Sequence, residues 1–319
     1  MRRYLWKKLF GLSFLLLCFF LFCGQTIMAA SRNFSPGHVY VEMRRVEQFI
    51  DALGLHMGIP DPEPLGVKVT DVSPHDVYFQ LRTLVIKANR LSFELSRISN
   101  DFPPLPNGRI RPGEVLAMAS KALEIMSAIN QKLQLPSAPQ KVVFEEGIVP
   151  SDVFMVALRV NRHLNSLLER RFSPAEAYEV VNLAIAYASN LLAQYPEAKR
   201  LPNKPLFEKN KRPLDVYYRL QNCLQLIEQI NQTLGLDILT MDISTITEGN
   251  IGPSDVYDVA TLLVARLDFL NKNEKIRTIP RETFYPGRKV PSDVYQQAGI
   301  LEQQLTTLLA YQIKKTADR

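Results

Sequence analysis

The sequence predicts an all-α protein of eight heptad-patterned helices, which arise from repeats of about 38 residues joined by long, proline-rich connectors. Three observations support this fold class. A motif of the form Pro-x-Asp-Val-Tyr, with variants, occurs eight times; an apolar residue recurs every 3.5 positions after each motif; and most remaining segments are rich in Pro and Gly. The chain has 319 residues, 46% of them hydrophobic, and this is enough to bury a substantial core.

The motif has the chemistry of a helix start. Its prolines are Pro36, Pro74, Pro112, Pro150, Pro174, Pro213, Pro253 and Pro291. Their intervals are 38 to 40 residues, except for one of 24. Proline suits the first helical position, because its missing N–H would have no partner there. Seven motifs carry an acid two residues later, where it can bond back to the N-cap residue and face the positive helix end. These acids are Asp76, Glu114, Asp152, Glu176, Asp215, Asp255 and Asp293.

The residues after each motif follow a heptad pattern. Counting from the motif Val or Ala in steps of 4, 3, 4 and 3 gives five positions per repeat, and all forty such positions are apolar. A sustained period of 3.5 residues indicates helices packed on helices, whereas strands would show a period of two. We therefore predict eight helices of about 18–26 residues.

The connectors leave the direction of the helices open. Segments such as 100–110, 135–149 and 278–290 contain several prolines, which exclude a second helix in each repeat. At about 3.3 Å per residue, an extended connector can return along a whole helix. Successive helices can therefore be parallel; the alternative is antiparallel helices joined by unusually long loops, which loop-length statistics disfavour.

The single short interval divides the repeats into two sets. It leaves two or three linking residues between the fourth and fifth helices, which predicts an antiparallel hairpin. We expect helical repeats 1–4 in residues 31–171 and repeats 5–8 in residues 172–319. One continuous array and two four-helix bundles both fit this pattern.

Residues 1–30 have the pattern of a secretory signal peptide. Basic residues precede an apolar run from Leu9 to Cys23, and small residues follow at Ala29 and Ala30. Cleavage near Ala30 predicts a periplasmic or secreted protein; a retained N-terminal anchor is the alternative. Removal changes the net charge from +6 to a near balance of 34 basic and 32 acidic residues. The mature chain therefore gives no indication of a nucleic-acid partner.

Candidate catalytic and metal-binding residues are few. The four histidines, His38, His56, His75 and His163, include no pair at i, i+4 spacing, and Cys223 is the one cysteine left after cleavage. Cys223 occupies a heptad position and is expected to be a small buried hydrophobe. The chain contains neither a GxSxG elbow nor a Gly-rich phosphate loop. We expect no enzyme activity, no cofactor and no metal.

The motif tyrosines are the candidate ligand-binding residues. They are Tyr40, Tyr78, Tyr178, Tyr217, Tyr257 and Tyr295. Each lies one residue after the heptad position, where packing against a neighbouring helix or connector is the ordinary role. If several helix starts share one end, the tyrosines and helix N-termini could instead bind an anion or a flat ligand.

These features predict an exported, non-enzymatic scaffold or protein-binding module that engages an envelope or secreted protein. Membrane contact is expected only through an uncleaved N-terminal segment. The alternative is a small-molecule carrier or sensor whose ligand lies near the motif tyrosines. A carrier requires a pocket of several hundred Å³, and a scaffold requires an exposed apolar patch or groove.

Overall fold

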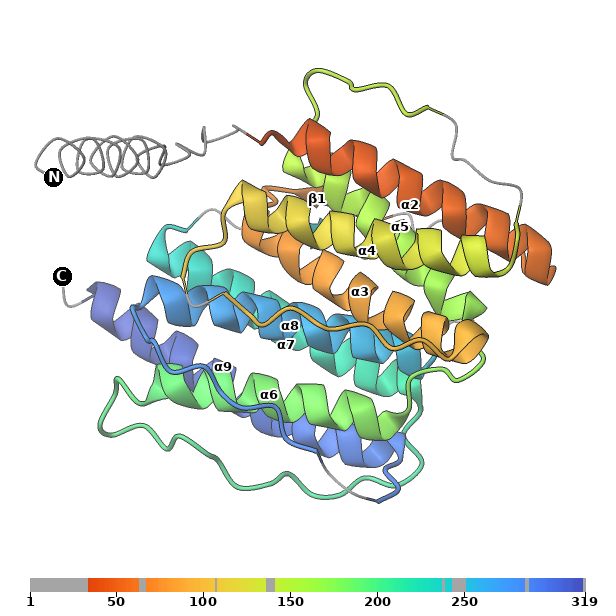
Figure 1. Cartoon of the computed structure of the whole chain (residues 1–319). Helices are drawn as coiled ribbons and strands as arrows, with labels where there is room; N and C mark the ends of the chain where they lie inside the picture. The colour runs from red at the N-terminus through yellow and green to blue at the C-terminus, as the bar shows by residue number, and fades with distance from the viewer. Residues whose placement is uncertain are drawn as a thin grey trace, which may run out of the picture. The chain divides into compact units, whose positions relative to one another are not determined.

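A computed structural model describes residues 34–62, 67–106, 108–135, 141–236, 239–242, 251–284 and 287–317 (Figure 1). The predicted signal peptide, residues 1–30, lies outside the described residues. Residues Ser35–Arg319 form one compact unit. Its described part is all-α, with helices α2 (Pro36–Met57), α3 (Pro74–Ser96), α4 (Pro112–Lys132), α5 (Pro150–Leu167), α6 (Pro174–Leu192), α7 (Pro213–Leu234), α8 (Pro253–Asn273) and α9 (Pro291–Ala317).

Each of these helices begins at a motif proline, as the sequence predicts. The motif acid accepts a hydrogen bond from the backbone N–H of the residue before the proline, for example Asp76 from Ser73 at 2.9 Å and Asp215 from Arg212 at 2.7 Å. In α2, His38 Nδ1 takes the place of the acid and lies 3.2 Å from the Ser35 nitrogen. Capping interactions of this kind stabilise a helix by about 1 kcal/mol each. The motif is therefore a set of helix caps.

The heptad positions form the core. All forty are buried, and none is more than 4% exposed. The prediction for Cys223 is confirmed, because the thiol is free and buried, and that burial raises its pKa above the ordinary value. The local period of the sequence thus identifies the face that each helix turns inward.

The helices within each half of the unit are parallel. The motif prolines and valines of α2, α3, α4 and α5 surround one small apolar gap. Those of α6, α7, α8 and α9 surround another, with Ala177 in place of one valine. Four helix starts therefore meet at each of these places, and the parallel interpretation is confirmed. Parallel packing gathers four positive helix ends, which the carboxylates of the motifs offset.

The two groups of helices have the same internal arrangement. In the first group, α2 and α3 each pack against α4 and α5; in the second, α6 and α7 each pack against α8 and α9. The main helix contact between the groups joins α3 to α8. These two run antiparallel, since His75 near the start of α3 meets Asp268 late in α8. The groups therefore point in opposite directions (Figure 1).

The connection between α5 and α6 differs from the predicted tight hairpin. It comprises residues 168–173, because α5 ends at Leu167, earlier than the pattern suggested. The two helices run in opposite directions but belong to different groups. The division into repeats 1–4 in residues 31–171 and repeats 5–8 in residues 172–319 stays a prediction.

A short strand pair also joins the two groups. Strands β1 (Lys68–Thr70) and β2 (Thr240–Asp242) lie in connectors and pair antiparallel, with Val69 opposite Met241. At three residues each, they link the connectors without adding a sheet layer.

Candidate functional site

The contact between α3 and α8 contains buried charges that the sequence patterns did not predict. Arg266 Nη1 lies 2.9 Å from Asp76 Oδ1, and both side chains are almost fully buried. His75 Nε2 lies 2.8 Å from Asp268 Oδ2 near the same end of the contact. Burying charges is costly unless they are paired. These pairs join α3 to α8 across the boundary between the two groups of helices.

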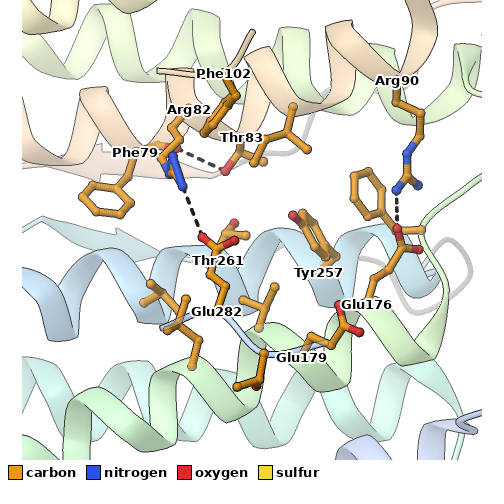
Figure 2. Close-up of a pocket in the computed structure, with 16 residues that line it drawn as sticks. Phe79, Arg82, Thr83, Arg90, Phe102, Glu176, Glu179, Tyr257, Thr261 and Glu282 are labelled. Atoms are coloured by element: carbon orange, nitrogen blue, oxygen red, sulfur yellow. Dashed lines mark hydrogen bonds and ion pairs between the residues drawn. The ribbon is translucent and has the colours of Figure 1, made fainter. Parts of the chain in front are cut away.

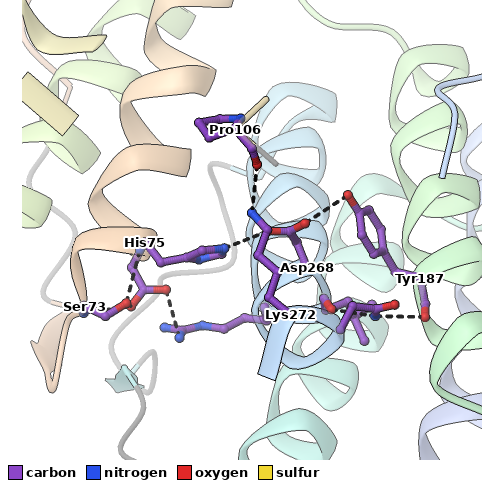
Figure 3. Close-up of polar contacts among 10 residues, drawn as sticks. Ser73, His75, Pro106, Tyr187, Asp268 and Lys272 are labelled. Carbon is purple, nitrogen blue, oxygen red and sulfur yellow. Dashed lines mark hydrogen bonds and ion pairs between the residues drawn. The ribbon is translucent and has the colours of Figure 1, made fainter. Parts of the chain in front are cut away.

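Asp268 is the centre of one polar cluster (Figure 3). The Tyr187 hydroxyl donates to its Oδ1 at 3.2 Å, and Lys272 Nζ lies 2.9 Å from its Oδ2. Burial is the largest single influence on the pKa of Asp268, and by itself it would raise that pKa and favour the protonated acid. The hydrogen bond from His75 and the charge of Lys272 outweigh it and hold the pKa of Asp268 below its usual range. Asp268 is therefore a buried carboxylate held by side chains from three helices.

Lys87 is the centre of a second cluster, further along α3. Its side chain is fully buried, with Nζ 2.6 Å from Asp258 Oδ1 on α8. The same nitrogen donates to the backbone carbonyl of Asn161 on α5 at 3.2 Å. Burial lowers the pKa of Lys87, and the Asp258 carboxylate opposes that change. Lys87 therefore links both groups of helices.

A half-open cleft of about 380 Å³ lies beside this contact (Figure 2). Its walls come from α3, α6 and α8, and from the connectors that follow α3, α5 and α8. Aromatic side chains form much of the lining, namely Phe79, Phe102, Phe172 and Tyr257. Phe172 stacks on Tyr257 with ring centroids 3.9 Å apart. A cleft of this size can hold a small organic molecule.

The charges in the cleft are paired and stacked on its aromatic walls. Arg82 donates to Glu282 at 3.2 Å and lies over the Phe102 ring, 4.4 Å from its centroid. Arg90 bonds Glu176 and lies 4.0 Å from the centroid of Phe172. Burial would raise the pKa of Glu176, but the bonds from Arg90 and from Ser173 lower it overall. The cleft therefore presents aromatic faces together with fixed, ionised groups.

The structure distributes the six candidate tyrosines over several places. Tyr257 lines the cleft. Tyr295 lies in a separate shallow hollow, where Lys211 and Arg219 approach its ring. The ring of Tyr178 is approached by Lys289. Tyr78 and Tyr217 are buried, and Tyr40 is half-buried.

Because the groups point in opposite directions, Tyr40 and Tyr78 belong to one end and the other four tyrosines to the opposite end. Burial raises the pKa of Tyr217 to about 12 and that of Tyr257 above its ordinary value, so both phenols are neutral at physiological pH. A ligand-binding role for the six stays a prediction.

Sequence reasoning missed Lys87, Arg266 and Asp268, because charged residues on amphipathic helices usually face water. One signal was available. Both α3 and α8 carry buried apolar residues outside the heptad positions, such as Val85 and Val264. A helix with apolar residues on two faces packs against other helices on both sides. Charged residues that lie between the two faces of such a helix are therefore buried.

Among the described residues, no helix combines the length and apolarity that a membrane crossing requires. No protein-family model matches the chain, and no curated protein or solved structure matches it either.

Proposed function

We propose that this protein is an exported, non-enzymatic binding module of the cell envelope, and that its connectors carry the surface that binds a partner protein. One observation supports this proposal above the others. Within the described part of the chain, fourteen large apolar side chains are exposed, and ten of them lie on connectors between helices. These are Ile98, Val143, Phe144, Val149, Leu201, Leu206, Phe207, Ile279, Phe284 and Val290.

The distribution of these side chains favours a role in binding. Leu206 and Phe284 are 91% and 82% exposed. Burying one such side chain against a partner contributes about 1.5–3 kcal/mol. Scattered exposed apolar residues are ordinary, so the support comes from their concentration on the connectors, where a partner could cover them without disturbing the helices. The described connectors run along the outside of the helices (Figure 1).

Photo-crosslinking in the cells that make the protein tests this proposal. We expect a photoreactive residue at Leu206 or Phe284 to trap an envelope protein in an adduct of defined mass. The matched control positions, Ser120 and Gln303, are exposed on helix surfaces and should give no adduct. Once the partner is identified, Leu206→Ser should weaken its binding by about tenfold or more, because 1.4 kcal/mol corresponds to a factor of ten. Equal crosslinking at connector and helix positions would contradict the proposal.

The cleft favours a second candidate function, a carrier of a small amphipathic molecule. Its aromatic walls and fixed charges suit a flat ligand that bears a charged group. The aromatic anion 1-anilinonaphthalene-8-sulfonate is a suitable probe. We expect saturable fluorescence at one equivalent, which Thr261→Phe should abolish by filling the cleft.

The control variant for the cleft is Thr306→Phe, because Thr306 is exposed on α9. It should bind the dye as the unmodified protein does. Melting curves would confirm that both variants are folded. If a folded Thr261→Phe protein still binds the dye, the carrier function is contradicted. The proposal that the connectors bind a partner protein is not affected by that result.

A further inference from the structure

A buried histidine faces two carboxylates at the far end of the first group of helices. His163 lies on α5, Asp51 on α2, and Asp61 on the connector that follows α2. His163 Nδ1 is 3.4 Å from Asp51 Oδ1, and its Nε2 is 3.4 Å from Asp61 Oδ1. One oxygen or nitrogen atom from each of the three residues lies within 4.8 Å of the other two. The chain has thus brought together three groups of metal-binding type from separate elements.

The Nε2 atom of His163 is the one that indicates a ligand at this place. The His163 side chain is 5% exposed, and Nε2 has no hydrogen-bond partner in the described part of the chain. A buried polar atom without a partner costs about 1–3 kcal/mol. Asp51 lies beside the other ring nitrogen, and a proton on that nitrogen would leave the Nε2 lone pair free to bind a metal ion near Asp61. A carboxylate behind a histidine that faces a metal is a common arrangement.

The distances suit a metal of the size of zinc. Zinc binds histidine nitrogen and carboxylate oxygen at about 2.0–2.2 Å, so two ligands of a tetrahedral ion are about 3.4 Å apart. The separation of Nε2 and Asp61 Oδ1 has this value. A glycine also allows α2 to approach the ring, because a Cβ atom at Gly54 would lie 2.8 Å from Nε2. The two carboxylates reach solvent, since the Asp51 and Asp61 side chains are 51% and 73% exposed, while Nε2 itself is buried.

We propose that His163 and Asp61 bind a divalent ion of zinc type directly, with Asp51 holding the imidazole ring through Nδ1 and water completing the coordination. A mixed nitrogen and carboxylate set favours Zn²⁺ over Ca²⁺ or Mg²⁺, which prefer oxygen ligands alone. The ion joins the connector after α2 to α5. Spacing along the sequence had indicated no metal, because these residues come from three separate elements.

Zinc titration of the untagged, chelator-treated mature chain tests the proposal. We expect calorimetry to show saturable binding of about one equivalent of Zn²⁺, with a higher melting temperature and no comparable effect of Ca²⁺. Asp61→Asn should weaken zinc binding by at least about tenfold, and Asp51→Asn by about 10–100-fold, the range found for residues that orient a ligand. His163→Asn should abolish binding but removes a buried group, so the exposed Asp61 gives the cleaner variant.

Two control variants separate this site from general surface binding. His56→Asn changes an exposed histidine near the end of α2, and Asp101→Asn changes an exposed acid on another connector; both should bind zinc as the unmodified chain does. The alternative is that His163 and the two acids form a purely structural contact. Absence of saturable zinc binding, or an affinity that Asp61→Asn leaves unchanged, would overturn the proposal.

Discussion

Replacing Asp268 by alanine is expected to lower the free energy of unfolding by about 3–5 kcal/mol, the range found when one partner of a buried charge pair is removed. Asp268 is 1% exposed and accepts from or pairs with His75, Tyr187 and Lys272. Without the carboxylate, His75 and Tyr187 remain buried without this partner, and Lys272, which is 19% exposed, keeps its bond to the Pro106 carbonyl. The effect is large because one substitution affects contacts among three helices.

Urea denaturation measures this effect. Asp268→Asn keeps the shape and one acceptor oxygen, so we expect a smaller loss than for alanine. The control is Glu124→Ala, which removes an exposed acid paired with Lys121 and should change stability by less than about 1 kcal/mol. An Asp268→Ala protein as stable as the Glu124→Ala protein would show that the cluster contributes little.

The same residue gives a pH dependence with a definite sign. The folded-state pKa of Asp268 lies below the ordinary value of 3.8. Its stabilising contribution is therefore present above that value and disappears as the pH falls through the folded-state pKa. Because an amide does not titrate there, the Asp268→Asn protein should lose less stability on acidification than the unmodified protein.

Replacing Lys87 by methionine is the second large expected effect, with a loss of about 3 kcal/mol or more. Methionine fits the buried volume of the Lys87 stem but leaves Asp258 without its cation and removes the Lys87 donor from the Asn161 carbonyl. Asp258 retains the bond from Asn165 at 2.9 Å and is 18% exposed at its side chain. The expected loss therefore lies at the lower end of the range for buried pairs.

A double substitution tests the reason for this loss. Replacing a whole buried ion pair by apolar residues is often neutral or stabilising. Lys87→Met combined with Asp258→Leu should therefore recover most of the stability that Lys87→Met alone removes. If the two losses simply add in the double variant, the charge pair is not the cause.

Both substitutions bear on the cleft, because its walls need α3 and α8 to be correctly aligned. Arg82 and Arg90 extend from α3, the helix that also carries His75, Asp76 and Lys87. The buried pairs fix α3 against α8, and the arginines then reach Glu282 and Glu176 across the cleft. Loss of alignment should therefore reduce dye binding in the cleft at urea concentrations where the protein is still folded.

Much of the fold could be predicted from local patterns. The motif prolines locate every described helix start, because a helix start requires only residues close in sequence to satisfy its backbone groups. The heptad positions identify the buried face for a similar reason, since a period of 3.5 residues puts them on one side of a helix. The ends of helices were less certain, as α5 shows by ending at Leu167.

The candidate sites were much harder to predict. The motif tyrosines stand out in the sequence, yet only Tyr257 lines the cleft. The cleft arises where connectors and helices of both groups meet, and His163 faces acids from two other segments. Such groupings depend on contacts between residues far apart in the chain, which spacing and composition do not record.

The sequence by itself therefore determined the number of described helices, their starting residues, their caps and their inward faces. The tertiary structure alone decided that helices are parallel within each group, that the groups are antiparallel to each other, and that Lys87, Arg266 and Asp268 are buried. The physical reason is the separation along the chain of the residues that interact. Helix caps and heptad positions depend on residues close in sequence, whereas helix direction and the pairing of buried charges depend on partners from other segments.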